Sequence, residues 1–270
     1  MSKKFDIAIM NPPYDRNLHL KILEKVIPYA EETINISPIS AFQYSFVSGN
    51  TKKIDNLINN SQLEIAELID CDDSTKLFGL QSLGSDLAIM HFKDGKTDMN
   101  EIYKDIVPNY KLANKVLTKI RENLGKGIYP LREVLTSKGS ETSLKFVDGL
   151  SLKNHGGHGF SAFSCVSRNY TTAINYEKVS THIKYVNFKT KEERDNAWKS
   201  MTSKFMRWVQ KDVTQGSPDY KILFLCKDYT KPWTNKRFCD YFNITGYISD
   251  TEAEPDSEWE EILNTMEKYK

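Results

Sequence analysis

The sequence lacks a hydrophobic run long enough to cross a membrane, which takes about 20 consecutive apolar residues. It also lacks a visible signal peptide, because Met1-Ser2-Lys3-Lys4 leads into a short apolar stretch that Asp6 interrupts. We therefore expect a cytoplasmic protein with no membrane partner. Hydrophobic residues make up 39% of the 270 residues, which is enough for one large or two small packed domains.

Cysteine is scarce, and its spacing indicates neither a zinc site nor disulfide bonds. The four cysteines are Cys71, Cys165, Cys226 and Cys239, and no two form a Cys-x-x-Cys pair. This pattern argues against a zinc site and is typical of reduced thiols in a cytoplasm. We predict no bound metal, and we predict ordinary core positions for Cys71 and Cys226.

The chain also lacks an excess of positive or of negative charge. The chain has 37 basic and 36 acidic residues, which gives a net charge of +1. A strongly basic protein attracts nucleic acid through its overall field. Any contact of this chain with nucleic acid must instead come from a local basic patch.

The last absence is a glycine-rich turn of the kind that follows a strand in nucleotide-binding folds. Gly125-Lys126-Gly127 follows a predicted helix, and Gly156-Gly157 has no strand and helix around it. Neither segment qualifies as a cofactor fingerprint. The sequence therefore assigns no residue of this chain to cofactor binding.

The most informative stretch that is present comprises Asn11, Pro12, Pro13 and Tyr14, directly after an apolar run over residues 5–10. That run is short enough for one buried strand. Each proline fixes φ near −65° and lacks an N–H, so the chain leaves the sheet rigidly. The Asn11 amide oxygen and the Pro12 carbonyl can then accept hydrogen bonds from one amino group, while Tyr14 offers a ring for stacking. The alternative is a proline-terminated strand with Tyr14 packed on the surface.

The pattern along the first hundred residues indicates an α/β sheet. A helix over 18–31 that Pro28 ends or kinks, a strand over 33–38 and a helix over 52–60 precede strands near 65–70 and 86–92. Asp70, Asp72 and Asp73 indicate a turn after a strand and not a nuclease metal cluster. Beyond residue 100 we predict a helix over 111–124, a mixed region over 128–190 and a strand over 184–188.

Asn11–Tyr14 resembles motif IV of the S-adenosylmethionine-dependent amino-methyltransferases. Ile36-Ser37-Pro38 resembles the motif V strand, and Leu77-Phe78-Gly79 with residues 85–92 resembles the motif VIII region of gamma-type N6-adenine DNA methyltransferases. The resemblance implies half of a class I, Rossmann-like α/β methyltransferase sheet over residues 1–100. It also implies that Tyr14 and Phe78 stack on a flipped adenine whose amine Asn11 and Pro12 hold. An inward-packed Phe78 is the open alternative.

Residues 101–270 are then an α+β target-recognition and C-terminal helical region. Segments 188–194, 203–208, 232–235, 240–245 and 260–263 resemble the C-terminal tail of Eco57I-like restriction-modification methylases. This resemblance implies double-stranded DNA as a partner, with Lys204, Arg207 and Lys211 as candidate phosphate contacts. These three cations also fit a solvated helix face.

The half of the methyltransferase fold that binds S-adenosylmethionine precedes motif IV in the gamma order, and only ten residues precede Asn11. The strand over 5–10 is then an exposed apolar edge, which is a site of association. We expect a second polypeptide to supply the cofactor-binding half; a truncated product or gene remnant is the alternative. A non-catalytic DNA-binding relic or regulatory subunit is the competing function, followed by a protein-glutamine or RNA methyltransferase.

Overall fold

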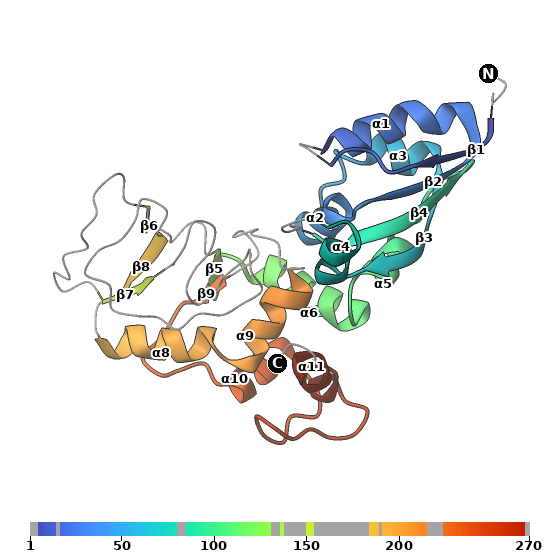
Figure 1. Ribbon diagram of the computed structural model, residues 1–270. Helices are drawn as coiled ribbons and strands as arrows, with labels where there is room; N and C mark the ends of the chain where they lie inside the picture. The colour runs from blue at the N-terminus through green and yellow to red at the C-terminus, as the bar shows by residue number, and fades with distance from the viewer. Residues whose placement is uncertain are drawn as a thin grey trace. The chain divides into compact units, whose positions relative to one another are not determined.

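A computed structural model shows two compact units, Met1–Tyr110 and Lys111–Lys270 (Figure 1). The structure describes residues 5–14, 17–79, 85–130, 136–137, 150–153, 184–188, 191–214 and 224–267. Within those residues no helix has the length and apolar composition that crossing a membrane requires.

The first unit contains a four-stranded mixed sheet in the order β1-β2-β4-β3. Strand β1 (Phe5–Met10) lies parallel to β2 (Ala30–Pro38). Strand β4 (Leu87–Lys93) pairs antiparallel with both β2 and β3 (Gln62–Ile69). The parallel pair arises because a helix connects β1 to β2, since parallel neighbours need a crossover connection.

That crossover is α1 (Leu18–Val26), which continues as a 3-10 turn over Ile27–Tyr29. The predicted end of the helix near Pro28 is therefore confirmed, because the proline interrupts the α-helical hydrogen bonding. The remaining helices of the unit are α2 (Ser40–Ser48), α3 (Asp55–Asn60), α4 (Cys71–Leu77) and α5 (Met99–Ile106). Helix α2 ends at Gly49, whose φ of 68° favours glycine.

Helix α4 corrects one prediction. The aspartates at 70, 72 and 73 were expected in a turn, but Cys71–Leu77 forms a helix. The backbone N–H of Ser74 donates to the Asp70 carbonyl, and that of Phe78 donates to the Ser74 carbonyl. Short polar residues favour both turns and the starts of helices, and in this chain they begin a helix.

The two faces of the sheet differ in burial. One face carries neutral polar and apolar side chains that are buried, namely Thr33, Asn35 and Ser37 of β2 and Ala88, Met90 and Phe92 of β4. The other face carries Ile7 and Ile9 of β1, Ile34 and Ile36 of β2, and Ile89 of β4. Ile7 and Ile9 are 53% and 79% exposed, and the other three are half-buried. On this second face the apolar side chains of β1 are therefore the least covered.

Strand β1 is also the edge of the sheet, as the sequence predicted. In the described part of the chain it pairs with β2 alone. Phe5, on the same side of the strand as Ile7 and Ile9, is 60% exposed. An uncovered apolar edge strand invites pairing with another strand.

The second unit is a mixture of helices and short strands. Helix α6 (Tyr110–Asn123) confirms the predicted helix, and β8 (Lys184–Phe188) confirms the predicted strand. Strand β8 pairs with β6 (Thr136–Ser137) and β7 (Leu150–Lys153), while β5 (Ile128–Pro130) pairs with β9 (Phe224–Cys226). The other helices are α8 (Lys191–Met201), α9 (Lys204–Trp208), a π-helix (Val209–Val213), α10 (Asn235–Phe242) and α11 (Glu258–Glu267).

Aromatic rings form the core of this unit. Phe205 stacks on Phe238 and Phe242 at centroid distances of 5.0 and 5.1 Å. Phe224 from β9 contacts the same two rings. Cys226 is buried beside this cluster, as predicted, and burial raises the pKa of its thiol, so it stays protonated. The side chain of Cys71 lies outside the description.

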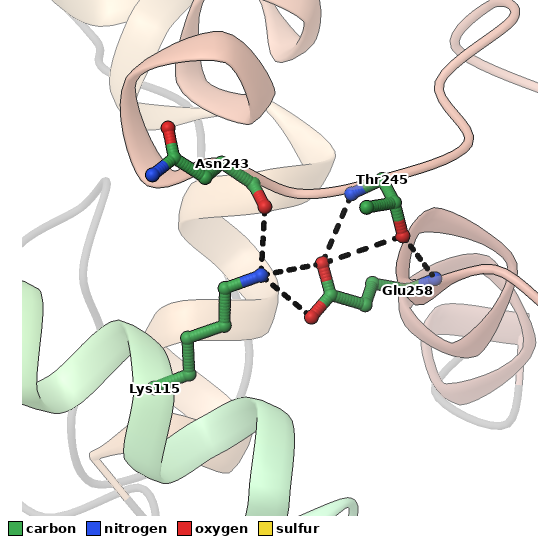
Figure 2. A network of polar contacts seen from close by, with 4 residues as sticks. All are labelled: Lys115, Asn243, Thr245 and Glu258. Atoms are coloured by element: carbon green, nitrogen blue, oxygen red, sulfur yellow. Dashed lines mark hydrogen bonds and ion pairs between the residues drawn. The ribbon is translucent and has the colours of Figure 1, made fainter.

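A polar network joins three segments of the second unit (Figure 2). The Lys115 ammonium donates to both Glu258 carboxylate oxygens, at 2.6 and 2.7 Å, and to the Asn243 carbonyl at 2.7 Å. Glu258 also accepts from the Thr245 N–H at 3.0 Å. The network thus ties α6 to the turn after α10 and to the start of α11.

We expect Lys115→Met to lower the free energy of unfolding of the second unit by about 1–2 kcal/mol, because it leaves partly buried acceptors without their charged donor. The side chains of Lys115 and Glu258 are 37% and 25% exposed. Denaturant titration measures the change. Lys236→Met is the matched control, since Lys236 and Asp240 are both 63% exposed; an equal loss in both variants would contradict a special role for the network.

Candidate functional site

Asn11–Tyr14 leaves the sheet at the carboxyl end of β1, beside the carboxyl end of its parallel neighbour β2. Pro12 is buried, Tyr14 is half-buried, and Asn11 and Pro13 are exposed. The buried proline anchors a turn whose polar side chain faces solvent. In open α/β sheets ligands bind outside this end of the strands.

Tyr14 fixes the Asn11 side chain. The Tyr14 hydroxyl donates to Asn11 Oδ1 at 2.6 Å and lies 3.4 Å from the Ile36 carbonyl oxygen of β2. Burial raises the pKa of Tyr14, so the phenol stays neutral and keeps its proton to donate. A carboxamide oxygen has two lone pairs, and the second remains available to a ligand. The structure therefore brings together two of the predicted residues by a direct hydrogen bond that the sequence did not indicate.

Phe78 follows the last residue of α4 and is half-buried. Its N–H donates to the Ser74 carbonyl, which fixes its backbone at the helix end. Among the described residues Phe78 makes no ring contact with Tyr14. Its predicted role as a second stacking surface stays a prediction.

The sequence analysis missed buried polar side chains close to the Asn11–Tyr14 turn. His19 in the first turn of α1 is 2% exposed and lies edge-on to the Tyr14 ring, at 6.1 Å between centroids. Asn35 of β2 is fully buried and donates to Ser37 Oγ at 2.6 Å. The signal in the sequence was a histidine next to Leu20 at the buried start of a helix.

The three predicted phosphate contacts lie in the second unit and are half-buried. The Lys204 ammonium donates to the Asp250 carbonyl at 2.5 Å. Arg207 is in the last turn of α9, and Lys211 is in the π-helix that follows. These positions put all three on one continuous helical segment, but their side chains are not fully solvated.

No cofactor site emerges from the described residues. They contain no group of three or more His, Cys, Asp or Glu side chains that could hold a metal. One cavity of about 540 Å³ is lined by Glu24, Lys25, Ile27, Pro28, Asn56, Leu57, Asn60, Ser61 and Asp94. Because Ile27 and Pro28 precede β2 and Ser61 precedes β3, this cavity lies at the opposite end of the sheet from Asn11. Gly156-Gly157 lies outside the described residues.

No protein-family model and no curated protein matches this chain. A solved structure to which it is similar is the 23S rRNA methyltransferase ErmE, at 12% identity and a TM-score of 0.26. The match covers 47% of this chain, and this chain spans about half, 49%, of that one. A likeness this weak says nothing about activity. What the structure itself defines is a mixed α/β unit with an amide, two prolines and a tyrosine at the carboxyl end of its edge strand.

Proposed function

We propose that this chain is the amine-binding half of an S-adenosylmethionine-dependent DNA adenine-N6 methyltransferase of the restriction-modification type. The observation that carries the proposal is the turn Asn11–Tyr14, which holds an exposed carboxamide oxygen in a fixed direction at the carboxyl end of β1. An amino group in front of this turn meets an oriented acceptor. The resemblance to motif IV supports adenine as the source of that amino group.

The turn acts on the amine by orienting it. The Asn11 oxygen and the Pro12 carbonyl accept hydrogen bonds from its two N–H groups, which draws the nitrogen toward a tetrahedral geometry and frees its lone pair from the ring. As the nitrogen gains a bond it becomes positive, and the same two dipoles stabilise that charge. S-adenosylmethionine would supply the methyl group and leave as S-adenosylhomocysteine, and the methylated nitrogen would then lose one proton to solvent. No residue of this chain is assigned to hold the cofactor.

The strand order supports the resemblance to half of a class I methyltransferase sheet. Strands β3 and β4 are antiparallel neighbours, as the last two strands of that fold are, and β1 and β2 are parallel. With α1 on the crossover to β2, a strand added on the free side of β1 creates a switch point beside Asn11. Such points are where α/β sheets bind ligands.

We further propose that a second polypeptide supplies this strand and the cofactor-binding half. The support is the free edge of β1 and the apolar side chains on its uncovered side, Phe5, Ile7 and Ile9. Parallel strands are ordinarily covered on both faces. Pairing and coverage by a partner would bury this surface and place its cofactor next to the amine.

Double-stranded DNA is the proposed substrate, with the target adenine flipped out of the helix. Tyr14 and Phe78 are the proposed stacking residues, and Lys204, Arg207 and Lys211 are the proposed phosphate contacts. Their common helical segment supports this assignment, because cations in a row can follow a backbone.

The test is methyl transfer by the chain purified with its natural partner from its source cell. Labelled S-adenosylmethionine is incubated with mixed-sequence duplex DNA, RNA and protein, and the products are digested to nucleosides and amino acids. We expect label in N6-methyldeoxyadenosine. Label in RNA or protein would overturn the substrate, and tight calorimetric binding of S-adenosylmethionine by a monomer would overturn the need for a partner.

Two substitutions of Tyr14 separate its two roles. We expect Tyr14→Phe to keep the stacking ring but lose the bond to Asn11, which lowers methyl transfer about tenfold, the worth of one neutral hydrogen bond of about 1.4 kcal/mol. Tyr14→Ala also loses base stacking, worth about 1–3 kcal/mol more. Single-turnover rates and the fluorescence of 2-aminopurine at the target position measure the two losses. Equal effects of both substitutions would show that the ring does not stack.

A further inference from the structure

His19 is an unusual residue for its position. It is 2% exposed, and neither ring nitrogen makes a hydrogen bond of good geometry with the described residues; the polar group that interacts with the ring is the Tyr14 backbone. Leaving polar atoms buried and unpaired costs free energy. Packing of α1 alone would be served better by leucine, as at the neighbouring Leu20 and at Leu23, both buried.

The contact that His19 does make is with Tyr14. The two rings meet edge to face, with an interplanar angle of 86°. Tyr14 in turn donates to Asn11 Oδ1. A direct line of contacts therefore runs from the first turn of α1, through His19 and Tyr14, to the amide at the candidate site.

Within the described residues, the start of α1 lacks the usual local stabilisation of a helix end. Its N-cap residue, Asn17, has a φ of 62° and makes no side-chain cap hydrogen bond, and the first turn carries no acidic residue. Helix starts are usually fixed by such caps. Here the buried His19 ring contacts Tyr14 and so links the first turn to the Asn11–Tyr14 turn.

We propose that His19 is a positioning residue of the candidate site, whose buried neutral ring holds the Tyr14 ring in the orientation from which its hydroxyl reaches Asn11. This inference rests on the proposed function for its consequence in methyl transfer. The contact itself does not depend on that function. The two can therefore be tested apart.

The charge state of His19 adds a pH dependence. Burial lowers the pKa of His19 below its ordinary value of 6.5, opposed in part by the Tyr14 backbone, and no charged side chain of the described residues contributes. The titratable group in contact with it is the Tyr14 phenol, and the buried β2 residues Thr33, Asn35 and Ser37 are neutral. The pKa of His19 is lower in the folded chain than in the unfolded chain. The contribution of its neutral ring to the free energy of unfolding is therefore complete above pH 6.5 and is lost as the pH falls below that value toward the folded-state pKa.

The experiment uses the full chain without cofactor, DNA or partner. NMR follows the Asn11 side-chain amide and the Tyr14 ring, assigned with Asn11→Ala and Tyr14→Phe, from pH 8 down to about pH 5, the range in which histidine titrates. We expect both signals to move together with one titration below pH 6.5. His19→Phe keeps a flat ring and removes this titration, and His19→Ala moves the Asn11 signals toward their positions in Tyr14→Phe.

His91→Phe is the matched control. His91 lies on the other face of the sheet, 2.9 Å from Glu32, and its loss leaves the Asn11 and Tyr14 titration unchanged. An unchanged titration in His19→Phe would overturn the inference. In the reconstituted enzyme above pH 7, His19→Ala lowers kcat about tenfold with little change in KM, and His19→Phe restores it. Coupling without any methyl transfer would sink the proposed function and leave the positioning role standing.

Discussion

Replacing Asn11 with alanine should lower methyl transfer by about 10²–10³-fold, the usual cost of removing one oriented group that meets developing charge. The amide oxygen is the polar side-chain atom that the turn presents, and Tyr14 holds it in place at 2.6 Å. Without it the amine keeps at most one acceptor, and its lone pair stays delocalised into the ring.

The same substitution should leave DNA binding within about twofold, because affinity for DNA comes chiefly from phosphate contacts. Asn11 is exposed, and its hydrogen bond to Tyr14 is not part of a buried core. The fold should therefore tolerate alanine at this position.

Single-turnover methyl transfer and fluorescence anisotropy with labelled duplex measure the two quantities on the same preparation. Asn59→Ala is the control, because Asn59 is an exposed asparagine on α3 in the same unit. Equal loss of binding and catalysis in Asn11→Ala would mean that Asn11 serves DNA binding and not the chemistry.

The elements that position the site were predictable because their patterns are local. An apolar run ending at Asn-Pro-Pro gave β1, which spans Phe5–Met10 as expected. Helical periodicity and Pro28 gave α1 and its end. In both places the terminating residues are prolines, whose geometry does not depend on the rest of the chain.

Strand β2 shows what a local pattern leaves out. Its extent was nearly predicted, but alternation suggests that Ile34 and Ile36 face the core. The structure buries Thr33, Asn35 and Ser37 instead and leaves both isoleucines half-buried. Which face of the strand is covered depends on where helices from other parts of the sequence pack. The sequence of the strand alone does not determine it.

Helix α2 was missed for a similar reason, whereas α5 was overlooked although its buried Ile102 and Ile106 lie four residues apart, as on one side of a helix. Helix α2 is apolar or small on nearly all sides, with Phe42, Phe46 and Val47 buried, so it shows no helical stripe. The bond between Tyr14 and Asn11 was missed because both residues were assigned to the substrate. Their contact with each other, and that of His19 with Tyr14, depend on the path of the turn in three dimensions.

The second large expected effect is the loss of assembly when the exposed edge of β1 is changed. We expect Ile9→Lys to prevent assembly with the partner while the chain itself stays folded. Ile9 is 79% exposed in the chain, so lysine there costs little. Once a partner covers this side of the strand, an unpaired ammonium would be buried at a cost of about 3 kcal/mol or more, which weakens assembly about 100-fold or more.

The measurement is light scattering and S-adenosylmethionine calorimetry on the tagged chain purified from its source cell. For the native chain we expect a molar mass above its own 31.1 kDa and binding of the cofactor. For Ile9→Lys we expect the molar mass of the chain alone and no cofactor binding. Ile248→Lys is the control, because Ile248 is 56% exposed in the second unit and should not disturb assembly. A native chain that is strictly monomeric, or an Ile9→Lys chain that still assembles, would rule out β1 as the docking edge. Natural edge strands use charged residues to avoid pairing, so Ile9→Lys gives β1 the protection against pairing that isoleucine at this position does not provide.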